Sequence, residues 1–419
     1  MSVGRARLDC LPRAEDALKH NSVLALLVYM TLAVILFTAG CGRQSAASAV
    51  AVQTPTPMAT RTSTSTPTPR PSPSPTATTG VTLSPQQMAG QRVIYSYTGL
   101  TPPAGLLSLI SHGEAAGVIF FGDNIASDAQ IRAVIETLRR ADASRDNPVG
   151  APLLLMTDQE GGQIRHSSGP PLLSERQIGE SADPAAEATG AGTGAGLNLR
   201  SVGMNVNLAP VLDVYRQAGD FDDQYGRSYS TSPEVVSELG ADFIRAQQNE
   251  RVAATAKHFP GLGAATRSQN TDAEAVTLSL SKGTIRSVDE SPLKAAIAAG
   301  VRLVMVCWAT YPALDPGVPA GLSSVVVQGE LRRRLGFQGV TITDSLKAKS
   351  LRAYGTFGQR ALLAAEAGMD LILCAKGHVS EGEEAMNGLE SGLLDGTLSK
   401  PEFRASLQRV IDLRYSLGG

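Results

Sequence analysis

Polar and charged residues follow several short apolar runs of this chain, at the point where each run ends. These positions are held by Asp158 with Gln159 and Glu160, by Asp213, by Lys257 with His258, by Trp308 and by Asp344. Taken singly, each residue could be a helix cap or a solvated loop charge. A carboxylate at the tip of an apolar strand is costly unless it is solvated or paired, so the repetition indicates a site. Carboxylates there could act as nucleophile or as general acid and base, while the lysine and histidine could donate hydrogen bonds.

Eight β-rich runs must position these residues. They are RVIYSY at 92–97, GVIFF at 117–121, PLLLMT at 152–157, MNVNLAP at 204–210, VAATAK at 252–257, VRLVMVC at 301–307, GVTITD at 339–344 and MDLILC at 369–374. Most are apolar on both faces, which is typical of buried parallel strands. Helical stretches lie between them, and Ser232 and Ser291, each followed by proline, are candidate helix caps. The pattern favours an α/β fold of the (β/α)8 TIM-barrel type over a doubly wound open sheet.

The composition excludes several classes of protein. The 419-residue chain has a formal net charge of −2, whereas a nucleic-acid-binding protein would show a basic surplus. Its four cysteines and five dispersed histidines form no zinc motif such as HExxH. It has neither a GxxxxGK[ST] loop nor a GxSxG motif, and GAGTGAG at 190–196 does not fit GxGxxG. We therefore expect no metal, no cofactor and no nucleic-acid partner.

The first 84 residues differ from the rest of the chain. Residues 1–40 combine a basic segment, an apolar run at 23–37 and small residues directly before Cys41, the layout of an export signal that resembles a lipobox. We expect a lipidated Cys41 that anchors an extracytoplasmic protein to the cell membrane; an uncleaved transmembrane anchor is the alternative. Residues 41–84, rich in Pro, Ser and Thr, predict a disordered linker. Residues 85–419 remain for a single catalytic barrel domain.

Six segments occur in an order that is found in one enzyme family. They are LLLMTDQEGGQIR, VGMNVNLAPVLDV, GRSYSTSPEVV, AKHFPGLG, VMVCWATYPALD and LGFQGVTITDSL. From about residue 83 to 419 the chain thereby resembles glycoside hydrolase family 3. Within that family it is most similar to the single-domain β-N-acetylglucosaminidases, and less similar to the β-glucosidases that add a second domain. The resemblance implies a retaining glycosidase, in which a carboxylate attacks the anomeric carbon and a second group acts as acid and then as base.

The resemblance also implies roles for individual residues. The family nucleophile, the Asp of its (S/T)D-x-L motif, corresponds to Asp344. Asp158 is expected to accept hydrogen bonds from sugar hydroxyls. Arg227, Lys257 and His258 are the further substrate-binding positions, although His258 could instead be a structural histidine within its strand.

The acid/base position departs from the family pattern. The acetylglucosaminidase branch carries Asp-Ser-His in a loop after KHFPG, where this chain has Ser268, Gln269 and Asn270. Hydroxyl and amide groups do not titrate near neutral pH. In one interpretation Asp272, or Glu274 behind it, replaces the missing acid and the protein is an active glycosidase. In the other, the acid/base is absent and the protein is a catalytically impaired, glycan-binding surface lipoprotein.

We expect an active glycosidase that acts on β-linked N-acetylhexosamine-type or glucose-type sugars of a cell-wall or environmental glycan.

The sequence leaves two further points open. Trp308, the sole tryptophan, could stack on a sugar or belong to the core. Cys307 and Cys374 are expected to be buried thiols, and a disulfide between them is not excluded by sequence.

Overall fold

The computed structural model describes residues 82–418 of the chain. The predicted signal peptide at 1–40, the predicted lipidation site at Cys41 and nearly all of the predicted linker at 41–84 lie outside the described residues.

Eight parallel strands form the central sheet, one in each of the eight predicted runs. They are β1 (Val93–Tyr95), β2 (Gly117–Ile119), β3 (Leu154–Thr157), β6 (Val206–Asn207), β7 (Ala253–Phe259), β8 (Leu303–Val306), β9 (Val340–Thr343) and β10 (Ile372–Leu373). Two further strands, β4 (Gln159–Gly161) and β5 (Ile164–Arg165), make a small antiparallel hairpin just after β3.

The sheet closes on itself, which confirms the barrel and rejects the open sheet. The strand order is β10-β1-β2-β3-β6-β7-β8-β9. A parallel bridge between Ile342 and Leu371 joins its two ends, and the N–H of Leu371 donates to the carbonyl of Thr341 at 2.9 Å. A closed parallel barrel directs the carboxyl ends of all eight strands to one mouth.

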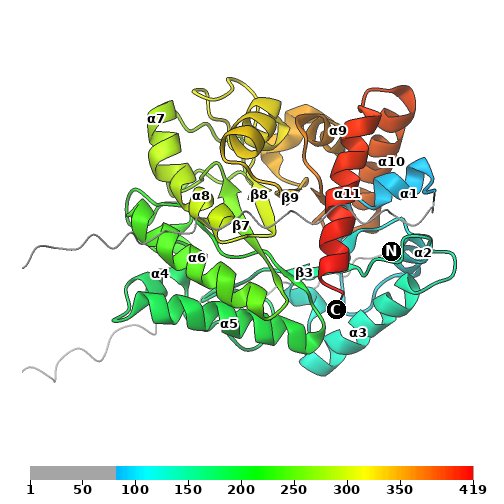
Figure 1. The fold of residues 1–419 in the computed structure, drawn as a ribbon, viewed down its shortest axis with the longest axis horizontal. Helices are drawn as coiled ribbons and strands as arrows, with labels where there is room; N and C mark the ends of the chain where they lie inside the picture. Colours follow the sequence, from blue (N-terminus) through cyan, green and yellow to red (C-terminus); the bar gives the residue numbers. More distant parts are fainter. Residues whose placement is uncertain (1–81, 419) are drawn as a thin grey trace, which may run out of the picture. The chain divides into compact units, whose positions relative to one another are not determined.

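Helices surround the strands (Figure 1). The α-helices are α1 (Pro85–Gly90), α2 (Ala104–Ser111), α3 (Asp128–Asp142), α4 (Glu175–Gly179), α5 (Pro184–Val202), α6 (Pro233–Asn249), α7 (Lys282–Thr284), α8 (Glu290–Ala298), α9 (Phe357–Ala367), α10 (Val379–Asp395) and α11 (Lys400–Ser416). The 3₁₀ segments are η1 (Gly122–Asn124), η2 (Asp223–Tyr225), η4 (Ala320–Leu322) and η6 (Lys349–Tyr354), and the π segments are η3 (Ile285–Asp289) and η5 (Val325–Arg334).

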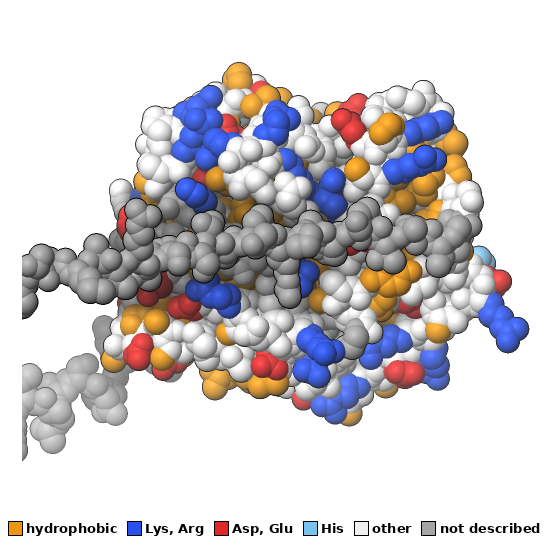
Figure 2. All heavy atoms as spheres, viewed as in Figure 1, with side chains coloured by type: hydrophobic (Ala, Val, Ile, Leu, Met, Phe, Trp, Pro, Cys, Tyr) orange, Lys and Arg blue, Asp and Glu red, His pale blue; other side chains and the backbone are white. Residues whose placement is uncertain are grey.

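Apolar residues fill both faces of the strands. Ile94 belongs to a cluster made by inward-facing residues of all eight strands, whereas Val93 and Tyr95 belong to the larger cluster between strands and helices. This alternation explains why the runs are apolar throughout, since each strand is buried on both sides. On the face that Figure 2 shows, Lys and Arg side chains are interspersed with Asp and Glu.

Local sequence signals account for several of the outer elements. Ser232 caps α6 by accepting the N–H of Val235, as predicted. The predicted cap at Ser291 is wrong, because the chain is already helical through η3 and Ser291 lies inside α8. The GAGTGAG run lies in α5, where a Cβ on Gly192 would come within 2.3 Å of the carbonyl oxygen of Phe243 in α6. Its small residues therefore serve close packing of two helices.

Candidate active site

A cavity of about 170 Å³ opens at the carboxyl ends of the strands. It is lined by the six predicted catalytic and substrate-binding side chains, namely Asp158, Arg227, Lys257, His258, Asp272 and Asp344. Lys257 and His258 lie in β7, and Asp344 directly follows β9. The fold thus brings together residues that are up to 186 positions apart, from Asp158 to Asp344. Their catalytic and binding roles remain predictions.

Asp344 is held at the mouth of the barrel by the backbone of its neighbour. Its Oδ1 accepts the N–H of Ser345 at 2.6 Å. Burial raises the pKa of Asp344, and the nearby charge of Asp272 raises it further; His258 and Lys257 act in the opposite direction but do not cancel the shift. The hydroxyl of the neighbouring Thr343 accepts the N–H of Leu373 at 2.9 Å and so connects β9 to β10.

The segment that carries Asp272 is anchored to the chain just beyond Asp344. The carbonyl oxygens of Thr271 and Asp272 accept the N–H groups of Ser350 and Lys349, each at 3.2 Å. Asp272 is exposed and lines the cavity, whereas Glu274 is exposed and does not line it. Of the two candidate acids, the structure therefore places Asp272 beside Asp344.

Asn270 stabilises the backbone of this segment. Its side-chain oxygen accepts the N–H of Asp272 at 2.8 Å, and it lines the cavity. Ser268 and Gln269 do not line it, and the side chain of Gln269 instead accepts the N–H of Thr266. Two of the three residues at the Asp-Ser-His positions, Gln269 and Asn270, therefore stabilise the conformation of the loop.

A network of buried ion pairs connects the lining residues Asp158, Arg227 and Lys257 to Glu160 and Asp222 behind them. The Nζ atom of Lys257 lies 2.7 Å from a carboxylate oxygen of Asp158 and 2.7 Å from one of Glu160. The guanidinium of Arg227 donates to Glu160 at 2.8 Å and to Asp222 at 2.8 Å. Burial disfavours a charged Glu160, but Arg227 and Lys257 outweigh it and lower its pKa to about 2.

His258 is paired with a buried carboxylate behind the cavity wall. Its Nδ1 lies 2.6 Å from Oδ2 of Asp213, which is fully buried. Burial opposes a charged imidazole, yet Asp213 raises the pKa of His258 above its usual value. One donor atom each of Asp213, Asp222 and His258 lie within 4.8 Å of one another, close enough for a cation. Since Nδ1 of His258 is already engaged by Asp213, we describe the group as a carboxylate–histidine pair with an adjacent acid.

Two members of this network were assigned no individual role from the sequence. Glu160 was named only as one of the polar residues after a strand, and Asp222 was not named, although both contact Arg227. The density of acids in Asp158-Gln159-Glu160 and in the 220–223 segment was the available signal.

The structure decides between the two alternatives that the sequence left open for Trp308. Trp308 is only 1% exposed, and its indole N–H donates to the carbonyl of Ser345 at 2.9 Å. It belongs to the core and supports the residue next to Asp344. Phe121 and Phe221 line the cavity instead. They are the aromatic side chains of the cavity lining.

Cys307 and Cys374 are both buried and both free. The expectation of buried thiols is confirmed, and the disulfide left open by the sequence is not formed.

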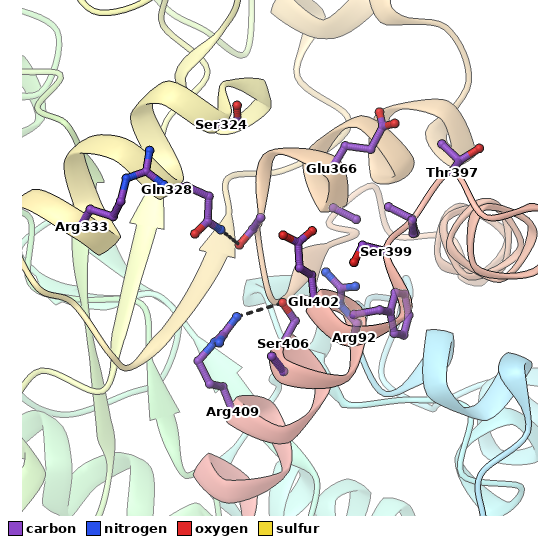
Figure 3. A pocket seen from close by; sticks show the side chains of 15 residues that line it. Arg92, Ser324, Gln328, Arg333, Glu366, Thr397, Ser399, Glu402, Ser406 and Arg409 are labelled. Carbon is purple, nitrogen blue, oxygen red and sulfur yellow. Dashed lines mark hydrogen bonds between the residues drawn. The ribbon is translucent and has the colours of Figure 1, made fainter.

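A larger cavity of about 520 Å³ lies elsewhere, between η5, α9 and α11 (Figure 3). Its wall contains Arg92 and Arg409, which are bound to a structural network: Arg409 donates to Ser406 at 3.0 Å and to Asp370 at 2.7 Å. The guanidinium of Arg92 lies 4.3 Å from the ring centre of Phe403. None of the predicted site residues lines this cavity.

None of the helices between residues 82 and 418 combines the length and the apolar character that a membrane crossing requires.

Comparison with known proteins places the chain in a family. The profile of the glycosyl hydrolase family 3 N-terminal domain matches residues 94–413. An "uncharacterized secreted glycosyl hydrolase" of Arthroderma benhamiae is 42% identical over 81% of this chain and 96% of its own length. A β-hexosaminidase of Nitrosomonas eutropha is 32% identical over 63% of this chain and 74% of its own.

Similar solved structures belong to enzymes of the same kind. A family 3 β-N-acetylglucosaminidase of Paenibacillus sp. has a TM-score of 0.75 at 32% identity, with 81% of this chain and 64% of that longer chain covered. A β-N-acetylhexosaminidase of Beutenbergia cavernae has a TM-score of 0.69 at 29% identity, with 80% and 98% covered. The chain therefore belongs to glycosyl hydrolase family 3 and is a glycoside hydrolase that acts on O-glycosidic bonds.

Proposed function

We propose that this protein is a retaining β-glycosidase in which Asp344 is the nucleophile and Asp272 is the acid/base. In the first step the carboxylate of Asp344 attacks the anomeric carbon while Asp272 donates its proton to the leaving oxygen. The glycosidic bond breaks and a glycosyl ester on Asp344 forms. In the second step Asp272, now a carboxylate, takes a proton from water, and the water oxygen displaces Asp344.

The observation that supports this proposal most strongly is the position of both carboxyl groups in the wall of one cavity. The charge of Asp272 contributes to the raised pKa of Asp344, so the two groups interact. Interacting carboxyl groups favour a state in which one is protonated and the other is ionised. The first step requires the proton on Asp272 and the charge on Asp344, so His258 and Lys257, which lower the pKa of Asp344, must offset the effects of burial and of Asp272 in the reacting complex.

We propose a β-linked N-acetylhexosamine-type or glucose-type sugar as the substrate. The relatives that are named β-hexosaminidases support this choice. The cavity of about 170 Å³ is smaller than the ~300–1,000 Å³ typical of larger ligands, which suits one sugar ring at a time. Asp158, Lys257 and His258 offer polar groups to its hydroxyls, and Phe121 and Phe221 offer apolar faces.

We further propose that the mature protein is extracytoplasmic and lipid-anchored at Cys41, with residues 41–84 as the linker. The description of the Arthroderma benhamiae relative as secreted supports an extracytoplasmic location. Labelling of growing cells with a fatty-acid analogue tests the anchor. The wild type should carry the label, and Cys41→Ala should lose it and leave the membrane fraction; equal labelling of both proteins would contradict the assignment.

A panel of fluorogenic β-glycosides tests the activity, and an activated fluorosugar of the best substrate tests the mechanism. The fluorosugar should inactivate the enzyme with release of one fluoride per chain, and mass spectrometry should find the sugar on the peptide that contains Asp344. Label on another residue would contradict the nucleophile assignment. Glycan binding without turnover of any panel member would favour the alternative, an impaired glycan-binding lipoprotein.

A further inference from the structure

Two buried carboxyl groups lie behind His258, outside the cavity lining. Asp213 is 0% exposed and Asp222 is 1% exposed. Asp213 acts as a hydrogen-bond acceptor at both oxygens: Oδ2 contacts Nδ1 of His258 at 2.6 Å, and Oδ1 accepts the backbone N–H of Leu262. A carboxyl group that accepts at both oxygens is best satisfied as an ionised carboxylate.

Asp222 is satisfied on one side only. Its Oδ1 accepts from Nη1 of Arg227 at 2.8 Å. Its Oδ2 is buried and has no hydrogen-bond partner among the residues that the structure describes. An oxygen of Asp222 lies within 4.8 Å of an oxygen of Asp213 and of a ring nitrogen of His258. A buried carboxylate oxygen without a donor is unfavourable, particularly beside a second carboxylate.

A proton on Asp222 removes both difficulties. It neutralises one of the two adjacent charges, and it gives Asp222 an O–H donor that Asp213 can accept. Burial and the charge of Asp213 raise the pKa of Asp222 to about 7, against the opposing effects of Arg227 and His258. Other charged groups interact with this set of residues, namely Glu160 and Lys257, Asp289 with its partner Arg216, and Asp344.

We propose that Asp222 is a positioning residue that shares one proton with Asp213 and so holds both Arg227 and His258 in the geometry that binds the sugar. The inference rests on the proposed glycosidase function. Asp213 fixes the Nδ1 side of the imidazole, and Nε2 is then the ring nitrogen left for the substrate. Asp222 fixes Arg227 through one oxygen and Asp213 through the other.

The shared proton gives substrate binding a pH dependence. Below about pH 7 the proton is present and the pair carries one charge. As the pH rises through this value, Asp222 ionises and a second negative charge develops beside Asp213. Arg227 and His258 are then drawn toward the carboxylates and away from the cavity. We expect KM, and the inhibition constant of the product sugar, to rise at least 5-fold between pH 6.5 and pH 8.5.

Asp222→Asn is the decisive variant. An asparagine can accept from Arg227 and donate permanently to Asp213, but it cannot titrate. Its KM should change less than 2-fold over the same pH interval. Asp223→Asn is the matched control, since Asp223 is also buried but pairs with Arg176, and it does not line the cavity. The control should keep the wild-type pH dependence of KM.

A KM that rises equally in wild type and Asp222→Asn would overturn the proposal. If Asp222→Asn does not fold, proton NMR of the wild type decides instead. The Nδ1 proton of His258, identified by its loss in His258→Gln, should shift with a midpoint near pH 7, and its absence at pH 6 would overturn the proposal. A wild type that hydrolyses no glycoside defeats the proposed function, whereas an active wild type with a flat KM defeats this inference alone.

Discussion

The ammonium group of Lys257 lies 2.7 Å from a carboxylate oxygen of Glu160, and each of these side chains is only 2% exposed. This ion pair joins β7 to β4 at the mouth of the barrel. Two charges in such a place are tolerated because each compensates the other. Without Lys257, Glu160 would keep Arg227 as its one remaining cationic partner among the described residues.

Lys257→Met should therefore destabilise the protein by about 3–5 kcal/mol, the usual consequence of breaking a buried pair. Urea denaturation measures the effect. The double variant Lys257→Met/Glu160→Gln should recover part of the lost stability, because the buried carboxylate that lost one of its two cationic partners is then neutral. Additive losses in the double variant would show that the two residues do not act as a pair.

Acid should weaken the fold through Glu160. Its pKa falls from 4.5 to about 2 on folding, so its charged form stabilises the native state above about pH 4.5. That contribution, on the order of 3 kcal/mol, is lost as the pH falls from 4.5 to 2. Glu160→Gln should be less stable than wild type at pH 7 and should lose less stability across this interval. Thermal melts test both points, with exposed Glu187→Gln as the control that should follow the wild type.

Asp344→Asn should separate activity from stability. Removal of a covalent nucleophile should lower kcat by about 10⁴-fold or more on an activated aryl glycoside. Because the pKa of Asp344 is raised, its ionised form is disfavoured in the folded state at neutral pH. The variant should accordingly melt at the wild-type temperature or above it. A large loss of melting temperature together with retained activity would contradict both assignments; Asp146→Asn, an exposed substitution, serves as the reference.

Asp272→Ala should lower kcat by about 10²–10⁴-fold on substrates with poor leaving groups, because proton donation to the leaving oxygen is lost. Substrates with activated leaving groups should show little change in the first step, and added azide should restore turnover through a glycosyl azide product. Glu274→Ala is the matched control and should behave like the wild type, since Glu274 does not line the cavity. The reverse pattern would make Glu274 the acid/base.

Arg409→Met should affect stability alone. Arg409 donates to Asp370 at 2.7 Å, beside the larger cavity. Loss of hydrogen bonds to this buried carboxylate should cost about 1.5–3 kcal/mol in the free energy of unfolding. KM and kcat should stay at wild-type values because neither residue lines the candidate active site. Arg404→Met, on the exposed side of the same helix, should leave stability within about 0.5 kcal/mol; an equal loss in both variants would remove the role assigned to Asp370.

The sequence predicted the architecture well because parallel strands are buried on both faces and stand out as apolar runs. Their limits were harder to predict. In the 369–374 run, β10 comprises only Ile372–Leu373 and Leu371 forms an isolated bridge, whereas β7 continues beyond its run to Phe259. The extent of pairing depends on neighbouring strands, which a single run does not reveal.

The sequence predicted those residues of the candidate site that lie at the ends of strands. Asp158, Lys257, His258 and Asp344 follow from the rule that barrel strands carry such residues at their carboxyl ends. The contacts of Asp222 could not be predicted from the sequence. They depend on how the 215–228 loop folds, which brings Asp222 to Arg227 of the same loop and to Asp213. The burial of Trp308 also required the structure, since a residue after a strand can face either the mouth or the helices.

The last strand of the barrel has a consequence for synthesis. β1, near the start of the domain, pairs on one side with β10. The edge of β1 that carries Val93 therefore stays unpaired until Ile372 has been synthesised. Arg414 of α11 connects the end of the domain to the segment before β3, because its guanidinium donates to the carbonyl of Pro152 at 2.8 Å. A chain that is still emerging from the ribosome cannot complete the ring, and closure must follow the release of nearly the whole polypeptide.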